Sequence, residues 1–441
     1  MKPHEVINAW KGDKRFGEMA RRAAALKKAG QSAEQIVQAI TAEFGPPPQL
    51  ATLRDAPGSF RVYGEVGTDI EPGAVAQLEL AMRLPVAERG ALAPDAHVGY
   101  ALPIGGVVGL SNAISPMFVG VDIGCRMACS LLDLNPDELL RHRTPLFADL
   151  KAITTFGAGA ERKIRADHDV LEDERWGLTN QSRGLRAKAV AQLGTSGAGN
   201  HFAELLVGER IGDDPTVPER FCALLTHSGS RGVGYAIANH YARLAAQETA
   251  RRAKVPAHYE WLDLDGEAGQ EYLALMQLAG AFAKANHDVI HAAFLRRSGL
   301  TALRHIENFH NFAWEEDGLV VHRKGATPAD KGVLGIIPGS MATNSYIVAG
   351  NGNPESLQSA SHGAGRRFSR TQARNSISMA DVRRFLAERD VLAEGVAVDE
   401  APQAYKDVER VIELQVAASL ITPIARMRPV AVIMAGEKGE D

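Results

Sequence analysis

The chain has 441 residues, of which 45% are hydrophobic and 23% are charged, and its formal net charge at pH 7 is -4. This composition is typical of a soluble globular protein, and the length allows one large domain or two to three ordinary ones. The slightly negative charge excludes a globally basic nucleic-acid binder, so any basic surface must be local.

Three cysteines occur in the chain: Cys125, Cys129 and Cys222. Their odd number and wide spacing argue against a disulfide framework and favour a reducing compartment. The N-terminal residues show no signal-peptide pattern, and no stretch is long and apolar enough to span a membrane. We therefore expect a cytoplasmic protein without a membrane partner.

An N-terminal extension, residues 1–50, is predicted to contain a helical hairpin over residues 14–44. Apolar residues recur there at helical spacing, and Gly30 is the expected end of the first helix. Ser32 with Gln35 resembles a capping box for the second helix, and a run of three prolines marks a boundary. Because charges cover the outer faces, the extension is interpreted as extra packing, with adaptation to a partner or an oligomer as the alternative.

The main body, residues 58–436, contains strand and helix patterns without a short-period repeat or a low-complexity linker, which favours one interlocked domain. Strands are predicted at residues 61–66, 104–110, 117–122, 202–205, 222–226, 319–323 and 429–434. Helices are predicted at residues 73–83, 136–152, 233–253, 268–296, 380–388 and 406–424. Irregular or turn-rich segments are predicted at residues 93–99, 158–190, 254–267 and 324–332.

The run from Gly120 to Met127 carries the first candidate ligands. An apolar stretch leads into it, and two glycines allow a tight turn. Asp122 and Cys125 are three residues apart, so one turn can direct a carboxylate and a thiolate at one point, a pair that suits a divalent transition metal. Taken alone, the run favours the alternative interpretation of a turn with a buried free cysteine.

The histidines of the chain favour the metal-site interpretation over the buried free cysteine. Of the fourteen in the chain, five lie in loops of small residues: His97, His201, His227, His310 and His362. Together with Asp122 and Cys125, these five predict a site for a metal and a phosphate. Six others lie in helical or loop patterns without a glycine-rich neighbour and are interpreted as surface or core residues: His142, His240, His258, His287, His291 and His305.

Seven motifs resemble, in order and approximate spacing over about residues 90–435, the signature of the RtcB family of RNA-splicing ligases. They are the runs Asp122–Cys125, Gly199–Phe202, His227–Gly232, His310–Asn311, Arg323–Ala326, Ile337–Met341 and Ser361–Arg366. The resemblance implies an α+β fold, in which one large domain at residues 58–436 has central mixed β-sheets flanked by helices.

The resemblance also implies an activity. Members of that family join an RNA 3′-phosphate or 2′,3′-cyclic phosphate to a 5′-hydroxyl, using GTP and two Mn2+ ions through a histidine–GMP intermediate. The implied partners are RNA ends, such as tRNA halves or broken RNA, and an archease-like activator. A monomer or a homodimer is expected, and the resemblance does not indicate which RNA is the physiological substrate.

By motif position, the resemblance implies that His362 is the nucleophile that takes GMP and that Asp95 orients its ring. Cys125 would bridge both metals, with His227 and His310 at one ion. Asp122 and His201 would hold the other ion. Guanylate contacts are implied for Asn200, Phe202, Glu204, Asn311, Ser340, Ser345, Ala364, Gly365, Arg366 and Tyr405. Contacts to the phosphates of the RNA ends are implied for Arg231, Lys324, Arg366 and Arg370.

Elementary chemistry is consistent with these roles. A neutral imidazole is a good nucleophile near pH 7 when an acceptor such as Asp95 holds its other nitrogen. Metal ions neutralise the charge that develops on an attacked phosphate, and a bridging Cys125 must be deprotonated. Glu204 can accept from the guanine N1–H and exocyclic amine, a donor pattern that adenine lacks. The mixed ligand set does not by itself select manganese, which is implied only by the resemblance.

The sequence departs from the family pattern near its end. Members usually finish with a Lys-Gly whose lysine touches the nucleotide, whereas Met434 stands here. A thioether donates no hydrogen bond, and Lys438 in the tail is a candidate substitute. Two alternatives therefore remain. One is a metal-dependent RNA-end phosphohydrolase or processing paralogue, which Met434 favours. The other is a non-catalytic RNA-binding protein, against which the intact ligand set argues.

Overall fold

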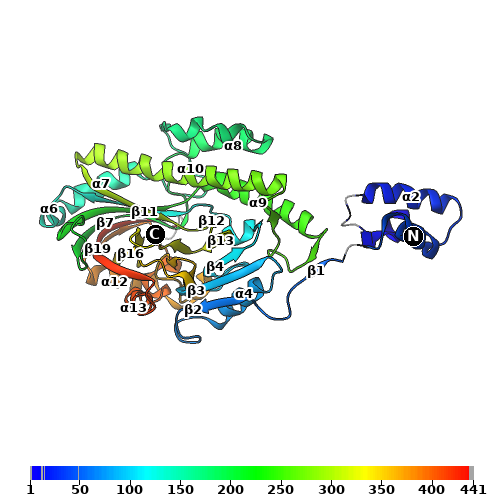
Figure 1. Cartoon of the computed structure of the whole chain (residues 1–441). Helices are drawn as coiled ribbons and strands as arrows, with labels where there is room; N and C mark the ends of the chain where they lie inside the picture. The colour runs from blue at the N-terminus through cyan, green and yellow to red at the C-terminus, as the bar shows by residue number, and fades with distance from the viewer. Residues whose placement is uncertain (1, 11–12, 14, 48, 437–441) are drawn as a thin grey trace.

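The computed structural model describes residues 2–10, 13, 15–47 and 49–436. Two β-sheets form the centre of the main body, and helices cover their outer faces (Figure 1). The chain therefore has the predicted α+β architecture, with an N-terminal helical extension to one side. Within the described ranges, none of the helices combines the length and the apolar character that crossing a membrane requires.

The larger sheet curls until its two edges nearly meet. Its strands follow the order β11-β6-β8-β7-β19-β16-β15, and β18 pairs with β19. Asn308 on β11 joins the edges, because its amide donates to the Ile336 carbonyl of β15 at 3.1 Å and accepts from the Ile336 N–H at 2.9 Å. Each of the seven strands in that order contributes apolar side chains to the interior of the curled sheet. The strands are β6 (Arg126–Leu132), β7 (Gly199–Arg210), β8 (Arg220–Ser228), β11 (Ala302–Phe309), β15 (Leu334–Ile337), β16 (Ser345–Gly350), β18 (Leu392–Glu394) and β19 (Ile421–Ala435).

The smaller sheet has the order β12-β13-β4-β3-β2, and its β2–β3 pair is parallel. Two residues, 310–311, connect β11 of the larger sheet to β12 of the smaller one, so the two sheets meet where the candidate histidines lie. The strands are β2 (Ser59–Val62), β3 (Ala87–His97), β4 (Ile104–Leu110), β12 (Phe312–Glu316) and β13 (Leu319–Lys324). The short strands are β5 (Ala113–Ile114), β10 (Leu262–Asp263), β14 (Ala326–Pro328) and β17 (Ser359–Ser361).

Helices cover the sheets from outside. In Figure 1, α10 runs along the larger sheet with α8 beyond it, and α4 lies beside β2 and β3. The α-helices of the body are α4 (Pro72–Met82), α5 (Pro116–Val119), α6 (Pro136–Arg141), α7 (Arg143–Ile153), α8 (Asn180–Gln192), α9 (Arg231–Thr249), α10 (Glu267–Ser298), α11 (Arg370–Ser376), α12 (Met379–Glu388) and α13 (Val408–Ala417). Short 3-10 helices are η1 (Asn8–Trp10), η2 (Asp169–Glu172), η3 (Glu174–Gly177), η4 (Pro354–Ser356), η5 (Val398–Glu400) and η6 (Pro402–Ala404).

The N-terminal helices form the predicted hairpin. The hairpin consists of α2 (Phe16–Lys28) and α3 (Ala33–Phe44), and the short helix α1 (Pro3–Val6) precedes it. Ser32 caps α3 in a capping box with Gln35, as predicted. These helices pack around a hydrophobic cluster of their own: Ile7, Trp10, Met19, Ala23, Leu26, Ile36 and Ile40. The chain enters the body where β1 (Ala51–Thr52) pairs with β9 (Ala253–Lys254).

The predicted strand at residues 117–122 is wrong. Pro116 occupies the first helical position of α5, where its fixed φ and missing N–H favour a helical start. Gly120 ends this short helix with a φ of 93°. The turn that carries Asp122 and Cys125 therefore follows a helix and leads into β6.

The predicted helix at residues 406–424 is too long. It ends at Ala417, and Ser419 has a φ of 55°, which no helix continues. Pro423 and its β-branched neighbours then favour extended chain. The predicted strand at 429–434 is only the second half of β19.

Other segments differ in extent. The strand predicted at 61–66 is β2, which lies earlier and is shorter. The irregular segment predicted at 93–99 lies mostly within β3, where a register shift accommodates a proline that cannot donate to the ladder. The segment predicted as irregular at 158–190 contains most of α8, whose few apolar residues give no clear helical pattern. The loop predicted at 324–332 contains β14.

Candidate active site

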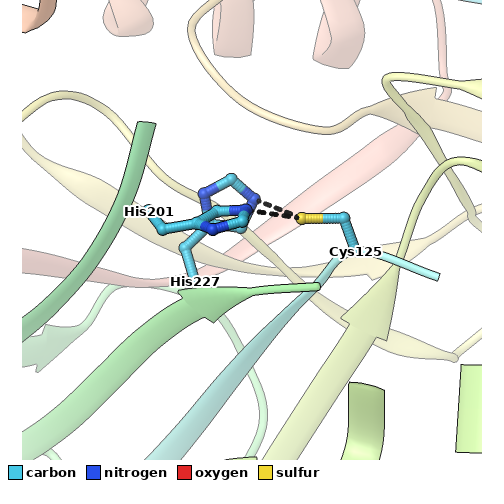
Figure 2. A group of neighbouring side chains, drawn as sticks. All are labelled: Cys125, His201 and His227. Atoms are coloured by element: carbon cyan, nitrogen blue, oxygen red, sulfur yellow. Dashed lines mark hydrogen bonds between the residues drawn. The ribbon is translucent and has the colours of Figure 1, made fainter. Parts of the chain in front are cut away.

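Donor atoms from distant parts of the chain converge where the two sheets meet. Cys125 Sγ lies 3.4 Å from Nε2 of His201 and 3.1 Å from Nε2 of His227 (Figure 2). These three ligand atoms all lie within 4.8 Å of one another. His310 Nε2 lies 3.4 Å from His227 Nε2, and Asp122 Oδ2 lies 3.1 Å from His201 Nε2. The structure thus brings together all five residues predicted as metal ligands.

Neighbouring strands and one connection position these donors. His227 on β8 lies opposite Phe202 of β7 and opposite Met127 of β6. His310 lies in the connection between β11 and β12, and its backbone N–H donates to the Cys125 carbonyl at 2.9 Å. The loop of Cys125 and the loop of His310 therefore hold each other in place.

Two glycines permit this close approach. Gly124 has a φ of 66°, and a Cβ at this position would lie 2.8 Å from the Cα of Gly280 in α10. A Cβ at Gly229 would lie 2.0 Å from Asp122 Oδ1. Larger residues would push the loops that carry Asp122 and Cys125 away from their neighbours, which explains the glycines of these motifs.

Hydrogen bonds at the far ring nitrogen determine which nitrogen carries the proton in two of these histidines, His227 and His201. The Asn200 carbonyl accepts from His227 Nδ1 at 3.1 Å, so Nε2 of the neutral ring presents a lone pair to Cys125. Arg231 instead donates to His201 Nδ1 at 3.1 Å, which places the proton of a neutral His201 on Nε2. A cation at that nitrogen requires the proton on Nδ1, so Arg231 must then change partner.

Burial sets the charge of the cluster. It lowers the pKa of His227 to about 3 and that of His310 well below its usual value, so both rings are neutral at pH 7. Burial and the Asp122 carboxylate raise the pKa of the Cys125 thiol well above its ordinary value. Although burial alone would raise the pKa of Asp122, its hydrogen bond with His201 holds it below the usual range. Neutral imidazoles, a carboxylate and a thiol that a metal can deprotonate fit a divalent transition metal.

His362 stands beside this cluster, and its ring centroid lies 4.8 Å from that of His310. Its Nδ1 donates to Asp95 Oδ2 at 2.7 Å, and its backbone N–H donates to the same oxygen at 3.1 Å. Burial opposes ionisation of Asp95, but the hydrogen bond and charge of His362 and the charge of Lys406 lower its pKa. The carboxylate therefore orients the ring, and Nε2 of His362 is the unprotonated nitrogen of its neutral form.

A cavity of about 800 Å³ opens beside the cluster, which is large enough for a nucleotide. Its lining includes Cys125, His227, His310 and His362. All ten residues predicted to contact the guanylate also line it: Asn200, Phe202, Glu204, Asn311, Ser340, Ser345, Ala364, Gly365, Arg366 and Tyr405.

The three residues predicted to contact only RNA phosphates are in different environments. Arg370 lines the cavity, whereas the lining drawn from the described residues includes neither Arg231 nor Lys324. The Lys324 ammonium is buried and donates to the Met117 carbonyl at 3.1 Å, and burial lowers its pKa to about 8. The Arg231 guanidinium packs over Gly197, where a Cβ would collide with it.

Sequence analysis missed a buried acid pair, Asp399 and Glu400. Arg370 lies 2.8 Å from Asp399 and 2.6 Å from Glu400, while Arg366 lies 3.3 Å from Glu400. The Tyr405 hydroxyl also donates to Glu400. The pair therefore orients three of the predicted nucleotide and phosphate contacts. The sequence signal that could have revealed the pair is two adjacent acidic residues within a run of alanine, valine and proline.

The backbone near His362 packs directly on β3. Gly365 has a φ of 73°, and a Cβ there would lie 2.0 Å from the Asp95 carbonyl oxygen. The Arg366 N–H donates to His97 Nδ1 at 3.4 Å. Burial lowers the pKa of His97 to about 4, so this fifth loop histidine is neutral at pH 7, and its Nδ1 also lies 3.4 Å from the Asp95 carbonyl oxygen.

Helix α10 supports the site from outside the sheet. Asn286 donates to the Gly229 carbonyl at 3.1 Å and accepts from the Gly194 N–H at 2.8 Å. It thereby ties together the loops that lead to His201 and away from His227. These contacts hold two ligand-bearing loops at a fixed separation.

Buried histidines of α10 extend this support. His287 Nε2 donates to the Ser228 carbonyl at 3.1 Å, and its Nδ1 accepts from the Thr226 hydroxyl at 2.6 Å. His291 Nε2 donates to the same hydroxyl at 2.8 Å, and its Nδ1 accepts from Ser130 Oγ at 2.7 Å. Only one arrangement of protons satisfies this chain with neutral rings. These core histidines therefore fix the backbone on both sides of His227.

Comparisons with known proteins agree with the motifs. The family model described as tRNA-splicing ligase RtcB matches residues 77–435. RNA-splicing ligase RtcB of Escherichia coli K12 is 32% identical across 87% of this chain and 99% of the relative. The tRNA-splicing ligase RtcB of Aeropyrum pernix is 30% identical across 77% of this chain and 86% of the relative. RNA-splicing ligase RtcB of Mycobacterium tuberculosis is 31% identical across 77% of this chain and 95% of the relative.

The family match begins well after the N-terminal helices and ends within the last strand, so it includes every ligand and cavity residue described above. It covers more than half of the chain, and the relatives align over most of their own length. The chain belongs to the RtcB family of tRNA-splicing ligases.

Proposed function

We propose that this chain, an RNA ligase by its family, uses GTP to join RNA 3′-phosphate or 2′,3′-cyclic phosphate ends to 5′-hydroxyl ends. The observation that carries the proposal is the contact of His362 with Asp95 beside the Cys125 cluster, at a cavity large enough for a nucleotide. A nucleophilic imidazole that is oriented by a carboxylate and adjoins a cation site suits nucleotidyl transfer.

Two Mn2+ ions are proposed at the cluster. Cys125 would bridge them, with His227 and His310 completing one site and Asp122 and His201 the other. When bound, the ions supply Lewis acidity that neutralises charge on the attacked phosphate. The neutral state of the His227 and His310 rings and the position of Sγ between two imidazole nitrogens support this assignment.

His362 is the proposed nucleophile. Its Nε2 attacks the α-phosphorus of GTP, an N–P bond forms and pyrophosphate leaves. Asp95 keeps the Nδ1 proton in place and stabilises the positive charge that develops on the ring. A 2′,3′-cyclic phosphate is first opened by one water molecule to a 3′-phosphate and a 2′-hydroxyl. An oxygen of the RNA 3′-phosphate then takes the guanylyl group and releases the imidazole. Finally, the 5′-hydroxyl attacks that phosphate, loses its proton, forms the phosphodiester and releases GMP.

The cavity wall is proposed to hold the guanylate, and its basic residues the RNA phosphates. Gly365 allows backbone to approach the nucleotide, and Arg366 can contact a phosphate from the same loop. Arg370 lines the cavity, which supports its proposed contact with RNA. Arg231 and Lys324 must leave their present partners before they can bind RNA phosphates.

Glu204 is proposed to select guanine, and its protonation makes this selection dependent on pH. Burial raises its pKa to about 8, so the side chain is a neutral acid at pH 7 in the empty cavity. Guanine offers two donors, which need the carboxylate, whereas a neutral acid also suits the donor and acceptor of adenine.

We therefore expect GTP affinity to rise by about tenfold per pH unit up to pH 8 and then level off, because binding requires the loss of one proton. ATP affinity is expected to stay level or fall over the same range. Equilibrium binding of both nucleotides between pH 6 and pH 9 measures this, and Glu204→Gln removes the titrating group. A GTP affinity that stays constant across this range would contradict the role of Glu204.

Met434 is a neutral side chain beside Glu204 and supplies no charge that would offset the burial of the carboxyl group. In the β7–β19 ladder, Val432 lies opposite Glu204 and Met434 lies opposite Phe202. Glu204 and Met434 are therefore diagonal neighbours on one face, and both line the cavity. The candidate substitute Lys438 lies outside the described residues.

Met434→Lys is expected to tighten GTP binding at pH 7 by roughly tenfold, since an ammonium within reach of Glu204 lowers its pKa and can also contact the nucleotide. The matched control is Met434→Leu, which keeps the volume without the charge and should leave affinity near the parent value. Calorimetric titration of both variants at pH 7 and pH 9 measures the change. If Met434→Leu raised the GTP affinity as much as Met434→Lys, packing rather than charge at this position would determine the affinity.

The experiment that tests the proposal mixes an RNA carrying a 2′,3′-cyclic phosphate with an RNA carrying a 5′-hydroxyl, in the presence of GTP and manganese. A joined product is the expected result, and ATP, magnesium and zinc are the comparison arms. Opening of the cyclic phosphate without joining would instead identify the phosphohydrolase or processing paralogue that Met434 favours. Binding of RNA with neither reaction would identify the non-catalytic RNA-binding alternative.

Further aspects of the cellular role are also proposed. Residues 58–436 are the proposed catalytic domain, and residues 1–50 are an attached helical extension. The hydrophobic cluster within the N-terminal helices supports an extension that folds around its own core. RNA ends are the proposed partners, with an archease-like activator, a monomeric or homodimeric state and a cytoplasmic location.

A further inference from the structure

An aromatic ring stands exposed at the edge of the candidate cavity. Tyr100 is 81% exposed and nevertheless belongs to the cavity lining. Two further apolar side chains of the lining are also exposed, Val98 at 49% and Val121 at 38%. Val121 adjoins Asp122 of the metal cluster in the chain. Exposed apolar side chains that line a cavity beside a proposed phosphate site mark a place where a ligand can bind.

The loop holds the residues on both sides of Tyr100 and leaves its ring outside. Gln77 accepts from the Gly99 N–H at 2.9 Å and donates to the Gly99 carbonyl at 2.8 Å. The Tyr259 hydroxyl donates to the Ala101 carbonyl at 2.9 Å, and Ala101 is fully buried. A Cβ at Gly99 would lie 2.6 Å from the Leu102 carbonyl oxygen, so the turn is tight.

This anchoring fixes the backbone that carries the ring. Stacking on an anchored residue costs less conformational entropy than stacking on a mobile loop. The Glu71 carboxylate also accepts from the Val98 N–H at 3.2 Å, which extends the anchoring to the start of the loop. The chain thus holds an aromatic face in water next to the proposed reaction site.

We propose that Tyr100, with Val98 and Val121, is a stacking platform for the nucleobase of an RNA end. The inference rests on the proposed function, because a ligase must bring RNA ends to the cavity that His362 and the Cys125 cluster line. Every base has an apolar face, so aromatic stacking holds an end without selecting its sequence. The platform complements Arg370, whose guanidinium lines the same cavity and can bind a phosphate.

The first test separates steps with and without RNA. For Tyr100→Ala we expect GMP transfer from GTP to the protein at the parent level, with a KM for RNA raised between about fivefold and a hundredfold. Tyr100→Phe keeps the aromatic face and should restore the KM. Tyr235→Ala is the control, because Tyr235 is 59% exposed on α9 and does not line the cavity. Loss of GMP transfer in Tyr100→Ala would overturn the proposal in favour of a nucleotide contact or a folding defect.

The second test identifies which RNA end stacks on Tyr100, and it does not require the protein to join the two RNAs. A 2-aminopurine base is placed at the terminal position of the 3′-phosphate strand or of the 5′-hydroxyl strand, and its fluorescence is followed on binding. We expect quenching at one of the two ends in the parent and in Tyr100→Phe, but not in Tyr100→Ala. Equal quenching by all three proteins, or by none, would overturn the platform. Absence of joining by the parent with quenching intact would overturn the proposed ligase while leaving the platform standing.

Discussion

His362→Ala is expected to retain no GMP after incubation with radiolabelled GTP and manganese, while the parent chain becomes labelled. The physical reason is that Nε2 of His362 is the unprotonated nitrogen beside the cluster, with Asp95 holding Nδ1 at 2.7 Å. Alanine removes the only atom proposed to form the N–P bond. Labelling of the denatured and washed protein measures the result.

His258→Ala is the matched control, because His258 is exposed and does not line the cavity. It should be labelled as strongly as the parent. The bond can be identified further by its stability, since a phosphoramidate on histidine is lost in acid and survives alkali. Equal labelling of His362→Ala and the parent would sink the proposed mechanism.

Asp95→Asn should be labelled with GMP more slowly than the parent but faster than His362→Ala. An amide oxygen can still accept from Nδ1, but the charge that stabilises the ring during attack is gone. We expect labelling to slow by roughly 10²- to 10⁴-fold while the protein remains folded. The apparent affinity for GTP should change far less than the rate, because Asp95 touches the nucleophile and not the guanine.

Local motifs made much of the site predictable from the sequence. Glycines, histidines and acids that serve a metal or a phosphate occur in short runs, such as Asp122–Cys125, because turn geometry is set over a few residues. Which runs meet in space is decided by strand pairing over distances such as the 102 residues between Cys125 and His227. Periodicity carries no information on that pairing, so the convergence was inferred from the residue types that these loops share and from the family resemblance.

Support from behind the site was not predictable in this way. His287 and His291 lie in a long helix without glycine neighbours, and their sequence surroundings are those of ordinary core residues. Their role follows only from the contacts with Thr226 and Ser228. The Asp399–Glu400 pair was missed for a related reason, because its arginine partners lie about 30 residues earlier in the chain.

The errors in the fold came from local patterns that tertiary packing overrides. The apolar stretch before Gly120 suggested a strand. Pro116 instead favours the start of a helix, and the four residues before Gly120 form one helical turn. A helical pattern continued past Ala417 because several apolar residues of β19 recur at compatible spacing. Pairing of β19 with both β7 and β16 determines the strand there, and no single-segment pattern contains that information.

Cys125→Ala is expected to abolish stable retention of manganese and, with it, GMP transfer. Sγ lies between Nε2 atoms of His201 and His227, so alanine leaves no atom to bridge two ions. Metal content of the purified protein after dialysis against added Mn2+ measures retention, and labelling with GTP measures function. Cys222→Ala is the matched control, because Cys222 is equally buried but packs in a hydrophobic cluster behind the sheet. It should keep its metal.

Retention in the parent should also depend steeply on pH. Burial and Asp122 raise the pKa of the Cys125 thiol, so the metal-free cluster keeps this proton at pH 7. A bridging sulfur must lose it, and affinity should therefore rise by about tenfold per pH unit for the one proton released. Calorimetry in buffers of different ionisation enthalpy counts that proton directly. Two outcomes would show that the sulfur of Cys125 is not a ligand. One is manganese uptake without proton release. The other is manganese retention that survives in Cys125→Ala and is lost in Cys222→Ala.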